Sequence, residues 1–189
     1  IMPPSLPSAF TVDLMTDAGV ASVRGQWKNM DVKIVDAPPR PGAGKWTSSY
    51  DIQPHAGEAG FDDASWPAIE ARSLADRRGG GRLYMTWFRT ALTIPERLGA
   101  FETAGATVVL TFTVDDYAEV WVNGALPRRL GRPSPATIQG FNMPNRVVLT
   151  ESVKAGDTFQ VAILGINGPI SVAPLNPLFV REARLDFYK

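Results

Sequence analysis

The sequence predicts an all-β fold, an antiparallel jelly-roll β-sandwich, because its clearest hydrophobic periodicity is that of strands. Residues 107–124 read T-V-V-L-T-F-T-V-D-D-Y-A-E-V-W-V-N-G. Apolar residues occupy every second position before Asp115-Asp116 and again after it, which is the period-2 pattern of half-buried strands. Asn123-Gly124 is well suited to a tight hairpin turn. We therefore expect an antiparallel hairpin here, and we find no convincing helical periodicity elsewhere.

Composition narrows the class of protein. The 189 residues fit one all-β domain, and the 44% hydrophobic fraction together with 17 glycines and 16 prolines is typical of a folded, loop-rich chain. Nineteen basic residues balance 19 acidic ones, so we expect neither a nucleic-acid nor a membrane partner. Cysteine is absent, which excludes disulfides, thiol nucleophiles and cysteine-ligated zinc.

The first half of the chain contains short strand-like segments separated by proline and glycine. Strands are expected around Val20–Arg24, Val32–Val35, Trp46–Ile52 and Leu83–Ile94. The last of these carries apolar residues on both faces, so we expect it to lie centrally between neighbours. Several prolines precede the first strand. We expect residues 1–17 to form a flexible N-terminal lead and residues 18–189 to form a single β-sandwich domain.

The second half of the chain contains a long excursion, Ala125–Asn145, and three further strand-like segments. Loops of this length in compact domains are usually functional or disordered. The strands are expected at Val147–Leu149, Thr158–Ile166 and Val180–Tyr188. The final strand alternates apolar with charged residues and is expected to have one buried and one solvated face. About eight to ten strands in all favour the jelly roll.

A series of motifs resembles a known module. In order they are F-D-D-A-S-W, W-F-R-T-A-L-T-I-P, V-D-D-Y-A-E-V-W-V-N-G, G-F-N and K-A-G-D-T-F-Q-V-A. This series, from Phe61 to about Ile166, resembles the galactose-binding-like jelly roll that precedes the catalytic domains of family 2 glycoside hydrolases. W-T-S-S-Y-D-I-Q-P-H-A-G, I-N-G-P-I-S and L-D-F-Y-K extend the likeness. With them, nearly the whole chain resembles the module ahead of the propeller in some bacterial SMP-30/gluconolactonase-like proteins.

The resemblance implies a non-catalytic accessory module of a bacterial carbohydrate-active or lactonase-like protein, secreted or periplasmic, with a saccharide as its ligand. The propeller and its metal-binding acidic residues are not in this sequence, so no lactonase activity is carried over. Two alternatives remain open. One is a structural domain that docks on a catalytic propeller or on a second copy of itself, and the other is a stand-alone hydrolase.

Catalytic signals are weak, and we assign no catalytic residue. His55 is the only histidine, and no nucleophile-elbow motif accompanies it. Asp62-Asp63 and Asp115-Asp116 contain paired carboxylates, as glycosidases do, but adjacent aspartates at turns usually accept hydrogen bonds from local backbone N–H groups. The same carboxylates suit Ca²⁺, although no EF-hand spacing is present. We therefore expect no cofactor and leave Ca²⁺ open.

Candidate ligand-binding residues fall in two regions. Near the linker, an exposed aromatic ring would stack on a sugar, and in and around the long loop, amide and guanidinium groups suit hydroxyl recognition. The candidates are Trp46, Tyr50, His55, Arg82, Asn142, Asn145, Arg146 and Asn167. The loop Arg77–Arg82 would form an opposite wall. Arg89 lies inside an expected strand, so we expect it to pair with an acidic residue on an adjacent strand.

Overall fold

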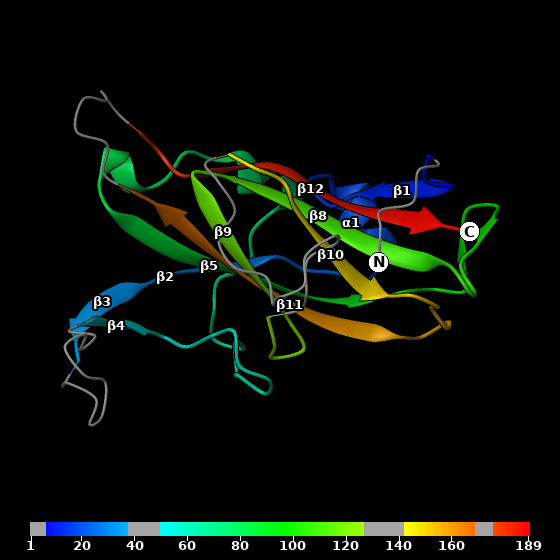
Figure 1. Cartoon of the computed structure of the whole chain (residues 1–189), viewed down its shortest axis with the longest axis horizontal. Helices are drawn as coiled ribbons and strands as arrows, with labels where there is room; N and C mark the ends of the chain where they lie inside the picture. Colours follow the sequence, from blue (N-terminus) through cyan, green and yellow to red (C-terminus); the bar gives the residue numbers. More distant parts are fainter. Residues whose placement is uncertain (1–6, 38–49, 127–141, 169–175) are drawn as a thin grey trace.

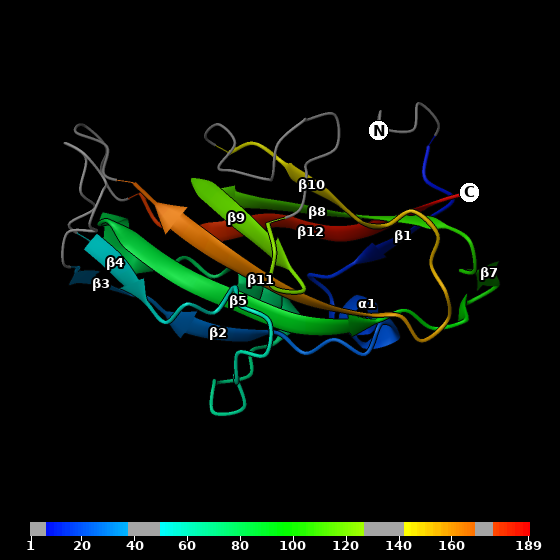
Figure 2. The same cartoon turned by 60° about the horizontal axis from the view of Figure 1, so that its bottom comes forward.

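The computed structural model describes residues 7–37, 50–126, 142–168 and 176–189. Its strands form two main four-stranded antiparallel sheets, with strand orders β1-β12-β8-β10 and β2-β5-β11-β9. Figure 2 shows the first sheet lying over the second. In Figure 1, the small β3-β4 sheet lies at one end of the molecule, beyond β2. The all-β sandwich that the sequence predicts is confirmed.

The elements have the following bounds. The strands of the first sheet are β1 (Phe10–Asp13), β12 (Phe179–Tyr188), β8 (Thr107–Asp115) and β10 (Asn145–Thr150), and those of the second are β2 (Lys28–Asp31), β5 (Tyr84–Thr93), β11 (Thr158–Asn167) and β9 (Tyr117–Val122). The small sheets pair β3 (Lys33–Asp36) with β4 (Tyr50–Gln53) and β6 (Arg97–Leu98) with β7 (Phe101–Glu102). Helical segments are α1 (Asp17–Ser22) and the 3₁₀ turns η1 (Ala71–Ala75) and η2 (Gly79–Gly81).

The main core lies between the two sheets. Every second residue of β8 from Val108 to Val114 lies in this core, as the alternation predicts. The opposite face of β8 is buried too, so the expectation that this strand is only half buried is wrong. Trp27 enters this core from the segment before β2, and its ring centroid lies 5.9 Å from that of Phe112. Its indole Nε1 donates to the carbonyl of Leu14 at 2.9 Å. The largest side chain of the core therefore has its one polar group satisfied.

A second apolar cluster lies on the outer face of the β2-β5-β11-β9 sheet. Its buried members are Ala56, Trp66, Trp87, Ala162 and Leu164. Ala56 and Trp66 belong to the segment 54–67 between β4 and η1, which packs over this face. The expected central strand is thus confirmed, because β5 lies between β2 and β11 and is apolar on both faces.

The expected hairpin around Asp115-Asp116 is wrong in its pairing. β8 and β9 belong to different sheets, so this dipeptide carries the chain from one sheet to the other. Strand alternation is the same in a hairpin and in such a crossing, and the sequence pattern does not distinguish them. The turn at Asn123-Gly124 forms as expected, with positive φ at both residues and a bridge from Val122 to Ala125.

The expected strand at Val20–Arg24 is also wrong, because this region contains α1. Thr16 caps the helix by accepting a hydrogen bond from Gly19 N at 3.0 Å, and Asp17 lies in the first turn, where a negative charge is favourable. Gly19 cannot carry a side chain here, since a Cβ would lie 1.7 Å from the carbonyl oxygen of Asp13. In addition, residues 10–13, within the expected lead, pair with β12 as β1. Among the described residues, no helix is long and apolar enough to cross a membrane.

Truncation of a buried tryptophan tests the packing. Trp27→Ala should lower the free energy of unfolding by about 3–5 kcal/mol, because it removes a fully buried ring and leaves a cavity. Trp121→Ala is the control: this ring is only partly buried on the outer face, against Gly57, so its loss should be clearly smaller. Urea denaturation of both variants measures the difference, and equal losses would contradict the placement of Trp27 in the main core.

Candidate functional site

Polar side chains from four chain segments meet at one end of the sandwich. We call them the end cluster; its members are Asp115, Asp116, Asn142, Asn167 and Asn176. The aspartates lie where the chain crosses between the sheets, and Asn167 is the last residue of β11. Asn142 and Asn176 precede β10 and β12. The strand register brings the segments together, because Tyr117 pairs with Ile166 and Asp115 pairs with Phe179.

Asp116 is the centre of this cluster. Its side chain is 2% exposed, and its Oδ2 accepts hydrogen bonds from Gly168 N and Asn176 Nδ2, both at 3.1 Å. Its backbone carbonyl accepts from Asn142 N at 2.9 Å. Burial and a hydrogen bond with the neighbouring Asp115 raise the pKa of Asp116, against the two donors that lower it. A buried carboxyl beside a second one favours its neutral form.

Hydrogen bonds fix the side-chain orientations of two further residues of the end cluster. Asn167 is fully buried, and its Nδ2 donates to the carbonyls of Arg82 at 2.9 Å and Asn176 at 2.5 Å. Asp115 Oδ2 accepts from the guanidinium of Arg181 at 2.8 Å. The remaining oxygen of each side chain, Oδ1, is buried and has no donor among the described residues.

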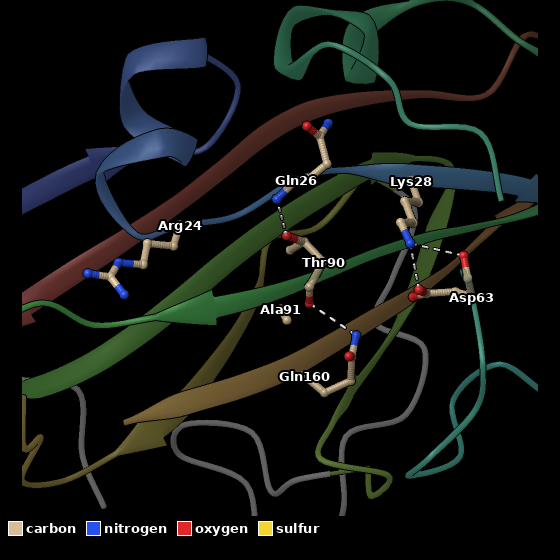
Figure 3. A pocket seen from close by; sticks show the side chains of 7 residues that line it. All are labelled: Arg24, Gln26, Lys28, Asp63, Thr90, Ala91 and Gln160. Atoms are coloured by element: carbon tan, nitrogen blue, oxygen red, sulfur yellow. Dashed lines mark hydrogen bonds and ion pairs between the residues drawn. The ribbon is translucent and has the colours of Figure 1, made fainter. Parts of the chain in front are cut away.

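A second polar region is a pocket of about 170 Å³ on the outer face of the β2-β5-β11-β9 sheet. We call it the outer-face pocket; it is lined by Arg24, Gln26, Lys28, Asp63, Thr90, Ala91 and Gln160. Figure 3 shows Arg24 at one edge and the Lys28–Asp63 pair at the other. Gln160 Nε2 donates to the carbonyl of Thr90 at 3.1 Å. The exposed Arg24 guanidinium has no hydrogen-bond or ion-pair partner among the described residues.

Asp63 holds one wall of the outer-face pocket in place. Its carboxylate accepts from Lys28 Nζ at 2.9 Å and from Arg89 Nε at 2.8 Å. Burial acts to raise the pKa of Asp63, but the hydrogen bonds and positive charges of Arg89 and Lys28 outweigh it and lower this pKa. Arg89, whose side chain is 2% exposed, also donates to the carbonyls of Ala56 and Phe61. The acidic partner of Arg89 therefore lies in the segment 54–67, and the expectation of a partner on an adjacent strand is wrong.

The structure brings some of the predicted binding residues together and separates others. Asn142 and Asn167 belong to the end cluster, which Arg82 joins through its backbone carbonyl. Asn145 is buried and donates to the carbonyl of Phe112 at 3.2 Å, which is a contact within the fold. Arg146 donates to the hydroxyl of Tyr188 at 2.8 Å across the β1-β12-β8-β10 sheet.

The remaining predicted residues lie near the β3-β4 hairpin. The side chain of Tyr50 is 65% exposed, and the imidazole Nε2 of His55 lies 3.0 Å from the carboxylate of Asp51. Trp46 lies outside the described residues. The sequence did not point to Asn176, Arg24, Lys28 or Gln160, because each is a single polar residue without a recognisable motif. Asp62 Oδ1 accepts from Ala64 N at 2.9 Å, in agreement with the local turn expected for Asp62-Asp63.

Comparisons with known proteins identify the fold. No family model matches the chain, and no curated protein matches it in sequence. This chain aligns with two solved structures from Bacteroides uniformis, one of a β-glucuronidase and one of a mutant of β-glucuronidase 2. Each alignment covers 94% of this chain at 15% identity, and the TM-scores are 0.52 and 0.53, respectively. A family 2 glycoside hydrolase β-glucuronidase also aligns, with 86% coverage, 15% identity and a TM-score of 0.45.

The alignment covers only a small part of those enzymes. The chain spans 18% of each of the two Bacteroides uniformis chains. The likeness at this identity concerns the fold, and it agrees with the resemblance to the jelly roll of family 2 glycoside hydrolases seen in the sequence motifs. None of the neighbours named here is a gluconolactonase-like protein, so that part of the resemblance stays a prediction.

Removal of the Asp63 charge tests the ion pair beneath the outer-face pocket. Asp63→Asn should lower the free energy of unfolding by about 3 kcal/mol, because it leaves the buried Arg89 guanidinium without a counter-charge. Asp62→Asn is the matched control: Asp62 is exposed, and an amide oxygen can still accept from Ala64 N, so the change should stay within about 0.5 kcal/mol. Denaturant titration of the two variants measures both values. Losses of similar size would show that the pair does not secure the segment 54–67.

Titration of Asp116 gives a second test. Its pKa is raised in the folded chain above the ordinary value of 3.8, so the folded state binds this proton more tightly than the unfolded state. The resulting stabilisation is complete below pH 3.8 and is lost as the pH rises through the raised pKa. In metal-free buffer, the stability of the parent relative to Asp116→Asn should therefore fall as the pH rises above about 4. Thermal melts across this range measure the difference, and a constant difference would contradict the raised pKa.

Proposed function

We propose that this chain is a non-catalytic accessory module of a carbohydrate-active protein and that it binds an acidic saccharide in the outer-face pocket. The observation that carries the proposal is the Arg24 guanidinium at the edge of this polar pocket, which no described residue pairs with. The sandwich fold supports the carbohydrate-active context, because it is shared with solved β-glucuronidases.

The chemistry of the lining residues supports a uronic acid as the ligand. A guanidinium matches the planar carboxylate of a uronic acid through two parallel hydrogen bonds. Lys28 adds a second positive charge, although Asp63 offsets much of it at 2.9 Å. The Oε1 atom of Gln160 can accept from a sugar hydroxyl, because the amide Nε2 donates to the carbonyl of Thr90.

The size of the pocket limits the affinity. Its volume of about 170 Å³ is smaller than the ~300–1,000 Å³ typical of pockets for drug-sized ligands. It therefore suits a single sugar ring or the end of a chain. A small contact area recovers little free energy beyond the cost of ordering the ligand, so a dissociation constant of about 1 mM is expected.

The absence of catalysis is part of the proposal. The His55 imidazole is hydrogen-bonded to Asp51, and no sequence motif supplies a nucleophile for it. Asp115 and Asp116 are adjacent in the chain, and Asp115 helps to raise the pKa of Asp116, whereas the two carboxylates of a glycosidase lie about 5–10 Å apart across the substrate. A secreted or periplasmic location and a lactonase-like parent protein stay part of the proposal.

A docking or dimerisation module without a small ligand is the second candidate. Ile34 and Tyr50, which are 42% and 65% exposed, both lie on the β3-β4 hairpin. Adjacent exposed apolar side chains are typical of protein contacts. A dimer that dissociates on Tyr50→Ser substitution, with no saccharide binding, would favour this candidate.

Calorimetry with glucuronate and glucose tests the proposed function. The parent chain should bind glucuronate at millimolar concentration and glucose more weakly. Arg24→Gln should weaken glucuronate about tenfold, because a charge-assisted contact contributes about 1.5–3 kcal/mol. Arg72→Gln is the control, since Arg72 is an exposed arginine paired with Glu70. Equal binding by parent and Arg24→Gln, or no binding of either sugar, would overturn the assignment of the pocket.

A further inference from the structure

We propose that the end cluster is a cation site that binds Ca²⁺ in preference to Mg²⁺. The ligands are side-chain oxygens that are buried and have no hydrogen-bond donor among the described residues. These atoms are Asp115 Oδ1, Asp116 Oδ1, Asn142 Oδ1 and Asn167 Oδ1. The site is separate from the outer-face pocket and does not depend on the proposed saccharide binding.

The register of the second sheet places two of these residues side by side. Tyr117 is paired with Ile166 on neighbouring strands, so Asp116 and Asn167 follow at the next position. Asn167 is on the inner face, because Gly165, two residues earlier, lies against Leu178 and Phe88 of the core. The hydrogen bond from Gly168 N to Asp116 Oδ2 holds the end of β11 against the carboxylate.

The other two residues are tied to the same point. Asn142 donates its backbone N–H to the carbonyl of Asp116 at 2.9 Å. Asp115 directly precedes Asp116 in the chain, and Arg181 donates to its Oδ2 at 2.8 Å. Each of these residues therefore has one buried side-chain oxygen that no described donor reaches.

The neutral amide of Asn167 distinguishes a cation site from a simple pair of acidic residues. Both protons of Asn167 Nδ2 are committed to the carbonyls of Arg82 and Asn176, so the orientation of the amide is set and its Oδ1 is left as an acceptor. One proton shared between Asp115 and Asp116 would satisfy the carboxyls and leave this buried amide oxygen unpaired. Roughly 90% of buried polar groups have a partner. A cation satisfies the carboxyl and amide oxygens together.

The ligand chemistry selects the metal. Carboxylate and amide oxygens are hard ligands, and Ca²⁺ accepts six to eight of them in irregular geometry, with water completing the shell. Mg²⁺ requires near-octahedral geometry and gives up its water reluctantly. Arg181 already offsets one of the two carboxylates, so the affinity should be modest, with a dissociation constant of about 10⁻⁴–10⁻³ M.

Thermal melting of the chelator-treated chain tests the site. About 10 mM CaCl₂ should raise the melting temperature by about 3–10 °C, and MgCl₂ at equal ionic strength should raise it much less. Asp116→Asn should abolish the Ca²⁺ shift. The control, Asp62→Asn, makes the same chemical change in the other Asp–Asp pair and should keep it.

Asn142→Asp provides a second, independent variant. It adds a carboxylate at the amide position and should strengthen Ca²⁺ binding about tenfold in calorimetry, which also supports the site if Asp116→Asn does not fold. The proposal is overturned if the parent shows no Ca²⁺ shift, because the two carboxyls would then simply share a proton. It is also overturned if Mg²⁺ acts equally, or if Asp116→Asn keeps the full Ca²⁺ shift.

Discussion

The buried ion pair of Arg89 with Asp63 is the contact on which the outer half of the molecule depends. Arg89 projects from the centre of β5 on the face away from the main core, where an uncompensated guanidinium would be costly. Asp63 and the carbonyls of Ala56 and Phe61 satisfy it, and all three lie in the segment 54–67. The same pair fastens this segment over Trp87 and positions Asp63 to hold Lys28. The Arg89–Asp63 pair therefore both holds the segment 54–67 over the second sheet and positions one wall of the outer-face pocket.

Much of the architecture follows from alternation in the sequence. The apolar residues on both faces of β5 predict its central place, and the period-2 pattern predicts β8, β9, β11 and β12 within a residue or two. The same pattern does not say which strands pair, so the crossing at Asp115-Asp116 resembles a hairpin. At α1, the capping residue Thr16 favours a helix over the strand that the apolar residues suggest, and Gly19 lets this helix approach the carbonyl of Asp13. The partner of Arg89 is 26 residues away in the chain, and no local pattern indicates it.

The sequence predicts the candidate sites less well than it predicts the fold. The amides of Asn142 and Asn167 were identified by their chemistry, and the register of β9 with β11 explains why they meet beside Asp116. Asn145 has the same chemistry but is used within the fold, because its strand places it against the carbonyl of Phe112. The outer-face pocket was missed because Arg24, Lys28 and Gln160 come from three distant segments that only the sheet brings together.

The central functional claim is that the face secured by Arg89 carries the ligand-binding pocket. Nuclear magnetic resonance of the isotope-labelled chain, titrated with glucuronate, tests it most directly. We expect the backbone resonances of Arg24, Gln26, Lys28 and Gln160 to shift together and to saturate with one dissociation constant. Shifts confined to Tyr50 and His55, or a spectrum that does not respond to glucuronate, would contradict it.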